Sequence, residues 1–221
     1  MPDTLPAIPD DVFLPWIRGW ALTREVAPPV PHGDGFRIDV GLPTQAARYV
    51  FRAPSPTLQA LGQTIDQPWV YLKARGTSAQ LRALLAPRWR IEEQHWMMAC
   101  DARPFPGSTG AVPPGYALHV EDDAARTRLA HVRIVDAQGA PAASGHLALD
   151  ARFAIYDRIV TEPAHRRRGL GRAVMHALQA IAHAHGRDAG ALVATDAGRA
   201  LYESLGWRLH APWATAVIPG P

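Results

Sequence analysis

The segment from Phe153 to His185 constrains the fold of this chain most strongly, because it reads as a strand, a loop and a helix in succession. Phe153–Thr161 is rich in aromatic and β-branched residues, which favour a pleated strand. Pro163 cannot donate to a strand ladder, so the strand should end before it. The loop Arg166–Gly171 contains three arginines and two glycines. Apolar residues then recur at spacings of four and three, which predicts an amphipathic helix that stops at Gly186.

The junction between this strand and this helix has the composition of an anion-binding site. The first turn of a helix carries backbone N–H groups without partners, and the helix dipole adds partial positive charge there. Gly169 and Gly171 have no Cβ, so phosphate groups can approach the backbone closely. Arginines contribute full charges and fork-shaped donors. A helix start with a merely solvated basic face is the simpler alternative, but the order of strand, proline, arginines, glycines and helix favours the anion site.

Two common phosphate loops match this junction less well. A P-loop requires Lys-Ser/Thr after its last glycine, whereas Arg172 and Ala173 stand here. A dinucleotide fingerprint requires a third glycine where Val174 stands.

The hexad from Arg166 to Gly171 closely resembles the acetyl-coenzyme A signature, Gln/Arg-x-x-Gly-x-Gly/Ala, of the GNAT superfamily of N-acetyltransferases. Downstream, Gly198–Trp207 resembles the family's helix that ends in Tyr-x-x-x-Gly-aromatic.

This resemblance covers about Tyr116 to Pro221 and implies an α+β fold with a splayed, mostly antiparallel sheet. The cosubstrate would be acetyl-coenzyme A, which enters the gap between the strands Phe153–Thr161 and Ala191–Thr195. The activity implied is transfer of an acetyl group to a primary amine, by direct attack in a ternary complex. The implied cofactor-binding residues are Ile159, Val160, Thr161, Arg166, Arg167, Arg168, Gly169, Leu170, Gly171, Arg172 and Thr195.

The resemblance also implies the residues that carry the chemistry. Tyr202 occupies the position of the family tyrosine that protonates the departing thiolate, although a tyrosine packed in the core is the alternative. The base is variable in the family and often lies on the central strand, where Asp157 is the nearest carboxylate. Glu162 or a water molecule could replace it. Two positions depart from the family pattern: Thr195 replaces an asparagine and Gly198 replaces an alanine.

The composition is that of a globular protein, with 48% hydrophobic and 19% charged residues in a chain of 221. No stretch approaches the ~20 apolar residues of a membrane span, and the acidic N-terminus lacks a signal-peptide core. The single cysteine, Cys100, excludes an internal disulfide and suits a reducing cytoplasm. Its apolar neighbours favour a buried structural thiol over a nucleophile. The net charge of +3 is too small to indicate nucleic-acid binding.

The chain is expected to have two halves. Residues 1–101 form an α+β half without a recognisable catalytic motif. Residues 102–115 form a connector rich in proline and glycine, and residues 116–221 form the catalytic half. GNAT proteins usually have two helices between their first two strands, but the interval between Tyr116–Val120 and Arg128–Val135 is too short for them. The first half is therefore expected to supply the wall of the acceptor site, as a degenerate GNAT-like half.

Two further expectations concern particular strands. Trp89–Cys100 is expected to form one long strand. Trp207–His210 and Thr215–Ile218 are expected to close the chain as two separate strands.

Other functions fit the sequence less well than acetyl transfer. No metal site is expected, because His183 and His185 are two residues apart, whereas helical metal ligands lie three or four apart. A coenzyme A-binding regulatory module without turnover is the main alternative. Binding of RNA or a protein surface through His165–Arg168 is a third, but it would require further basic and aromatic residues on one face. The expected partner is a small-molecule amine, and the sequence leaves open which amine and whether the chain forms a homodimer.

Overall fold

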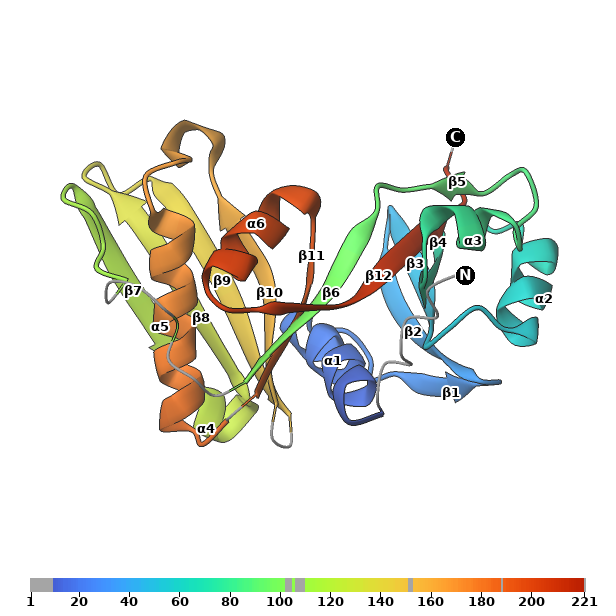
Figure 1. Cartoon of the computed structure of the whole chain (residues 1–221), viewed down its shortest axis with the longest axis horizontal. Helices are drawn as coiled ribbons and strands as arrows, with labels where there is room; N and C mark the ends of the chain where they lie inside the picture. Colours follow the sequence, from blue (N-terminus) through green and yellow to red (C-terminus); the bar gives the residue numbers. More distant parts are fainter. Residues whose placement is uncertain (1–9, 102–104, 106–109, 151–152, 188, 221) are drawn as a thin grey trace. The chain divides into compact units, whose positions relative to one another are not determined.

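The computed structural model describes residues 10–101, 105, 110–150, 153–187 and 189–220. The chain divides into two compact units (Figure 1). Unit 1 comprises residues 1–98, 193–196 and 209–221, and unit 2 comprises residues 99–192 and 197–208. The chain therefore passes between the units several times rather than once. The predicted division of labour, with an acceptor wall in residues 1–101, remains a prediction.

Unit 1 is an α+β layer structure whose sheet has the strand order β1-β2-β3-β4-β12. The β3–β4 ladder is parallel and the β1–β2, β2–β3 and β4–β12 ladders are antiparallel. Its strands are β1 (Val30–His32), β2 (Gly35–Leu42), β3 (Gln45–Phe51), β4 (Val70–Arg75), β5 (Arg90–Ile91), the first part of β6 (His95–Asp101) and most of β12 (Arg208–Val217). Its helices are α1 (Asp10–Thr23), α2 (Pro56–Thr64) and α3 (Ser78–Arg82).

Two helices of unit 1 carry recognisable local sequence features. α1 contains Pro15 beyond its first turn, where the missing N–H removes one intrahelical hydrogen bond. Thr77 caps α3 in a full capping box with Gln80. One face of the sheet packs in a core that includes Leu58, Leu72 and Trp89.

Unit 2 is a sheet with the strand order β7-β8-β9-β10-β11. Successive strands from β7 to β10 are antiparallel, and β10 and β11 are parallel. Its strands are β7 (Tyr116–Asp122), β8 (Leu129–Asp136), β9 (Pro141–Asp150), β10 (Phe153–Thr161) and most of β11 (Ala189–Ala194). Its helices are α4 (Ala124–Thr127), the 3-10 turn η1 (Pro163–His165), α5 (Leu170–Ala184) and most of α6 (Asp196–Ser204).

Helix α5 covers one face of the unit 2 sheet (Figure 1). Its buried residues include Val174, Leu178 and Ile181, which share one face of the helix. Gly145 of β9 makes this close packing possible, because a Cβ there would lie 2.7 Å from Val174 and 2.9 Å from Leu178. Gly186 follows the helix with φ +67°, the left-handed conformation expected of a glycine stop.

The predicted fold class, α+β with a mostly antiparallel sheet, is confirmed. The short interval between β7 and β8 accommodates only α4, a helix of four residues, in place of the family's usual pair. Much of the predicted connector, residues 102–104 and 106–109, lies outside the described residues. Among the helices of the described residues, none combines the length and apolar character needed to cross a membrane.

The expectations about Trp89–Cys100 and about the two closing strands were both wrong. The predicted strand Trp89–Cys100 is two strands, β5 and β6, because the N–H of Glu92 donates to Thr215 and the chain then leaves that ladder. The two predicted closing strands are one, β12, because Pro212 does not interrupt it. The carbonyl of Pro212 accepts a hydrogen bond from Gly76 (2.9 Å), and a proline can occupy a ladder position where its missing N–H is not required.

Candidate active site

The centre of the candidate site is a β-bulge on β10. The register of the β9–β10 ladder shifts between Asp157 and Val160, and Arg158 within it has φ +54°. A bulge leaves backbone groups outside the ladder and turns the strand. The shift brings Val160 to the sheet surface, with 46% of its area exposed. Of the sequence-predicted contacts, Ile159 lies within the shift, whereas Val160 and Thr161 are again paired with Ser144 and Ala143 of β9.

The two parallel strands β10 and β11 separate beside this bulge. Among the described residues, their ladder contains three pairs, from Phe153–Ala189 to Ile155–Ala191, although β10 continues to Thr161. From Tyr156 onward, β10 remains paired with β9 alone. The predicted splay of the sheet is thus present at the end of β10 that leads into the glycine-rich loop.

The glycine-rich loop has the conformation of a phosphate cradle. Gly169 is the N-cap of α5 with φ +81°, and no side chain caps the helix. A Cβ at Gly169 would meet nothing within 4 Å, so the space beside this backbone is open. A Cβ at Gly171 would lie 3.1 Å from Leu201 and 3.4 Å from Thr161. The N–H groups at the start of α5 can therefore donate hydrogen bonds to an anion such as a pyrophosphate.

The arginines of the loop are held in different ways. Arg166 donates to the carbonyl of Thr161 (3.3 Å), and Arg172 donates to the hydroxyl of Ser204 on α6 (2.9 Å). Arg168 donates to the hydroxyl of Tyr116 (2.8 Å). Since an arginine cannot accept, the Tyr116 hydroxyl can donate onward to Nδ1 of His165, at 2.9 Å. Arg167 has φ +63°, so the loop reverses at this residue before it reaches Gly169.

Unit 1 contains a strand–helix–strand segment of the same order, β3-α2-β4, but it lacks both features of the candidate site. The β3–β4 ladder stays paired over five positions, from Ala47–Val70 to Phe51–Ala74, so these strands do not separate. The N-cap of α2 is Ser55, whose hydroxyl accepts from the N–H of Leu58 (3.1 Å). Pro56 follows it and has no N–H. α2 therefore offers fewer free donors for a phosphate than α5, since Pro56 has no N–H and the N–H of Leu58 is occupied.

Tyr202 lies on α6 and is 7% exposed. Burial and then the charge of Asp157 raise the pKa of its phenol well above the ordinary value. Its ring packs 6.1 Å from the ring of Trp207. Among the described residues, its hydroxyl has no hydrogen-bond partner. The influence of Asp157 on Tyr202 indicates that the two predicted catalytic side chains are close to each other.

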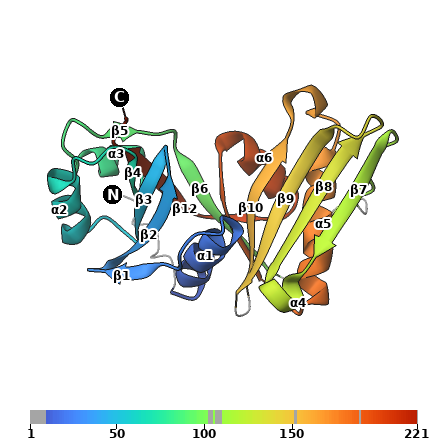
Figure 2. The same cartoon turned by 180° about the vertical axis from the view of Figure 1, so that it is seen from behind.

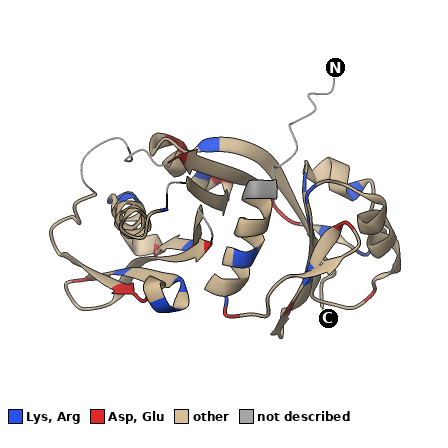
Figure 3. Ribbon diagram, turned by 90° about the horizontal axis from the view of Figure 1, so that it is seen from below, with Lys and Arg blue, Asp and Glu red and all other residues tan. Residues whose placement is uncertain are grey.

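The other sequence-predicted residues lie as follows. Glu162 precedes η1, and its N–H donates to the carbonyl of Ala142 (2.9 Å), so it follows directly on the β9–β10 ladder. Thr195 follows β11 and is grouped with unit 1, so its role as a cofactor contact remains a prediction. Among the described residues, no group of three or more histidines, cysteines or carboxylates is arranged to hold a metal ion. Basic and acidic positions are scattered over many elements (Figure 3).

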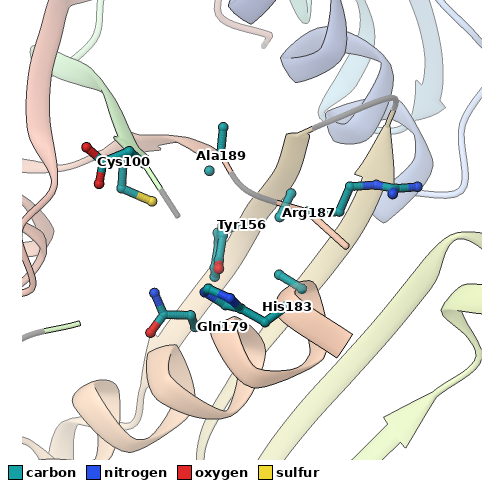
Figure 4. Close-up of a pocket in the computed structure, with 10 residues that line it drawn as sticks. Cys100, Tyr156, Gln179, His183, Arg187 and Ala189 are labelled. Carbon is teal, nitrogen blue, oxygen red and sulfur yellow. The ribbon is translucent and has the colours of Figure 1, made fainter. Parts of the chain in front are cut away.

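A small recess lies at the opposite end of β10 from the cradle (Figure 4). Its walls include Cys100, Tyr156, Gln179, His183 and Arg187. Gly190 forms part of the same wall, and a Cβ there would lie 2.7 Å from the sulfur of Cys100. The recess borders the first residues of β10 and β11, where these strands are still paired, so it is separate from the candidate site.

Cys100 should be a slow nucleophile in the folded protein, because burial raises the pKa of its thiol to about 12. An unfolded chain has an ordinary thiol pKa of about 8.5. At pH 8 the native thiolate fraction should therefore be smaller by a factor on the order of 10³. Reaction with a chromogenic disulfide reagent should be slow in the native protein and fast in guanidinium. Equal rates in both states would contradict a buried structural thiol.

Comparison with known proteins agrees with this geometry. Residues 120–209 match the family model described as an acetyltransferase (GNAT) domain. This segment contains the bulge, the cradle and Tyr202, and the GNAT acetyltransferase domain predicted from the hexad is confirmed over these residues. The family implies an acyl-coenzyme A donor. No curated protein matched the sequence of the chain.

Several solved structures share the fold at low sequence identity. A GCN5-related N-acetyltransferase from Kribbella flavida has a TM-score of 0.64 and 17% identity, over 91% of this chain and 93% of that chain. A GCN5-related N-acetyltransferase from Sphaerobacter thermophilus has a TM-score of 0.58 and 12% identity, over 85% and 78%. A GCN5-related N-acetyltransferase-like protein from Streptococcus suis has a TM-score of 0.59 and 12% identity, over 86% and 84%. These likenesses establish a GNAT-like fold.

Proposed function

We propose that this protein transfers an acetyl group from acetyl-coenzyme A to the primary amine of a small molecule, by direct attack in a ternary complex. The observation that carries the proposal is the uncapped start of α5 at Gly169, placed directly after a strand that separates from its parallel neighbour. This combination offers an anion site and a gap in the sheet at the same end of β10. Unit 1 lacks both in its equivalent segment, which supports a single cofactor site in unit 2.

The residues present fit the cosubstrate. The backbone N–H groups from Arg167 to Arg172 would bind the pyrophosphate, and Gly169 keeps that approach open because nothing lies within 4 Å of its missing Cβ. The edge of β10 that is no longer paired with β11, along Ile159, Val160 and Thr161, would pair with the amide groups of the pantetheine arm. The N–H of Val160 would donate to the thioester oxygen as negative charge develops there.

The remaining steps concern protons. The acceptor amine must lose a proton before it attacks, and Asp157, at the bulge, is the proposed base, with Glu162 or water as alternatives. The thiolate that leaves must gain a proton, and Tyr202 is the proposed acid. Its raised pKa keeps the phenol protonated at neutral pH, which is the form required of a proton donor. Because the thioester is already activated, no covalent enzyme intermediate is required.

We also propose that unit 1 contributes to acceptor recognition. Unit 2 has only the four residues of α4 between its first two strands, so it lacks the pair of helices that normally forms the acceptor wall. The residues that would select the acceptor amine contain no recognisable motif.

A screen of amines with the purified protein and acetyl-coenzyme A, monitored by release of the free coenzyme A thiol, tests the proposed activity. Hydrolysis without any dependence on an amine would contradict it.

Gly169→Asp should weaken acetyl-coenzyme A binding at least tenfold, which is ~1.4 kcal/mol. The aspartate would place a Cβ and a negative charge against the pyrophosphate. Calorimetric titration measures the effect. Gly186→Asp is the matched control, because Gly186 lies at the other end of α5, also has positive φ and also has nothing within 4 Å of its missing Cβ. Unchanged affinity in a folded Gly169→Asp variant would remove the cradle assignment.

A further inference from the structure

Figure 2 shows the unit 2 sheet from the face that α5 does not cover. The ladder registers place a row of four titratable residues across this face. In the ladder registers Glu121 lies opposite His131, His131 opposite His146, and His146 opposite Asp157. Directly opposed residues of antiparallel strands project to the same side. Gly145 faces α5, so its neighbour His146, and with it the whole row, faces the other way.

The two histidines of the row are in direct contact. Their ring centroids lie 4.3 Å apart with an interplanar angle of 27°, a stacked arrangement. Nδ1 of His131 lies 3.8 Å from a carboxylate oxygen of Glu121, and Arg133 lies 3.5 Å from the other oxygen. The side chain of His131 is 30% exposed and that of Glu121 is 63% exposed. The row thus leads from Asp157 at the bulge to a solvated carboxylate at the edge strand β7.

We propose that His146 and His131 are positioning residues for Asp157, which accept the proton that Asp157 removes from the acceptor amine and pass it to solvent beside Glu121. This inference rests on the proposed function. In the first step the substrate ammonium loses a proton to the Asp157 carboxylate and becomes a neutral amine. In the second step that proton moves to an imidazole, directly or through water, and the carboxylate is restored. Water at the exposed end of the row then removes the proton from the imidazolium.

The pair can hold only one proton with ease, because two imidazolium rings at this separation repel each other. The ladder registers place Glu121 and His119 of β7, Arg133 of β8, Ser144 of β9 and Asp157 of β10 on the same face as the pair. As the pH falls and the pair becomes protonated, it can no longer accept a proton from Asp157. The rate should therefore fall on the acid side as the pair is protonated, and histidine is the side chain whose charge changes nearest neutrality.

His146→Gln keeps a polar side chain of similar size and removes the titrating ring. The expected result is a plateau of kcat/KM lowered about tenfold, with an acid limb displaced to lower pH by at least about half a unit, because carboxylates titrate below imidazoles. His119→Gln is the matched control, since His119 lies on the same face opposite Arg133, one row away. A His146→Gln profile that superimposes on the wild-type profile, or an equal displacement in His119→Gln, would overturn the inference.

A second measurement does not depend on turnover. The imidazole resonances of His131 and His146 are followed by NMR as a function of pH in the wild type and in Asp157→Asn. Removal of the neighbouring negative charge should displace the titration of His146, which lies directly opposite Asp157, to lower pH. Histidine titrations that are the same in the wild type and in Asp157→Asn would contradict the proposed coupling, even if the enzyme is active. A wild type without amine-dependent thiol release would instead count against the proposed function.

Discussion

Tyr202→Phe should lower the turnover number by ~10²–10⁴-fold, the usual cost of removing a positioned proton donor. Acetyl-coenzyme A affinity should stay near the wild-type value, because the change deletes a single oxygen atom. That hydroxyl has no hydrogen-bond partner among the described residues, and phenylalanine can keep the ring packing against Trp207. Steady-state kinetics at saturating cosubstrate, together with calorimetric titration, separates the two quantities.

Tyr156→Phe is the control for this prediction. Tyr156 is also buried in unit 2, at 4% exposure, and its ring packs 5.1 Å from the same Trp207. Burial raises its pKa as it does for Tyr202, but it borders the recess rather than the bulge. A Tyr202→Phe variant that keeps more than half of the wild-type turnover would mean that Tyr202 is structural or that water protonates the thiolate. Equal losses in both variants would point to packing as the cause.

A fragment that begins at Pro113 should lose cooperative unfolding altogether. β12 lies in this fragment, but residues 209–217 of it belong to unit 1. Within that part, Trp213 to Val217 pair with β4 from Arg75 to Tyr71. Ala214, Ala216 and Ile218 are buried in the core of unit 1. Without residues 1–112 this strand has no ladder partner in β4, and an unpaired apolar strand is an aggregation site. Circular dichroism against temperature and size-exclusion chromatography provide the measurements.

A second fragment, residues 113–208, separates the effect of the unpaired part of β12 from the other effects of removing residues 1–112. It ends before the part of β12 that belongs to unit 1, so it should aggregate less than the fragment 113–221 if the orphaned strand is responsible. Cooperative unfolding of the longer fragment, with acetyl-coenzyme A binding and an unchanged Michaelis constant for the same amine, would contradict the proposal that unit 1 forms the acceptor wall. Unit 1 would then be an independent domain.

Features that depend on neighbours in the sequence were predicted well. The strand Phe153–Thr161 has the predicted limits, and α5 begins and ends within two residues of its flanking glycines, because strand propensity, proline and glycine act through the local backbone. The cradle hexad and Tyr202 were recognised for the same reason. The strands β5 and β6 were merged in the prediction because nothing local to Glu92 shows that its N–H will bind Thr215, more than a hundred residues away.

The tertiary structure alone decided the rest. The separation of β10 from β11 after three pairs, and the bulge after Asp157, depend on ladder register between strands that are distant in the sequence. The row from Glu121 to Asp157 assembles four strands whose residues no local pattern connects. The incorporation of β12 into unit 1 is likewise a matter of which sheet edge can bury its apolar residues. The sequence determined the anion cradle and the family, since both reside in contiguous residues, whereas the pairing of distant strands determined which side chains surround the reacting atoms.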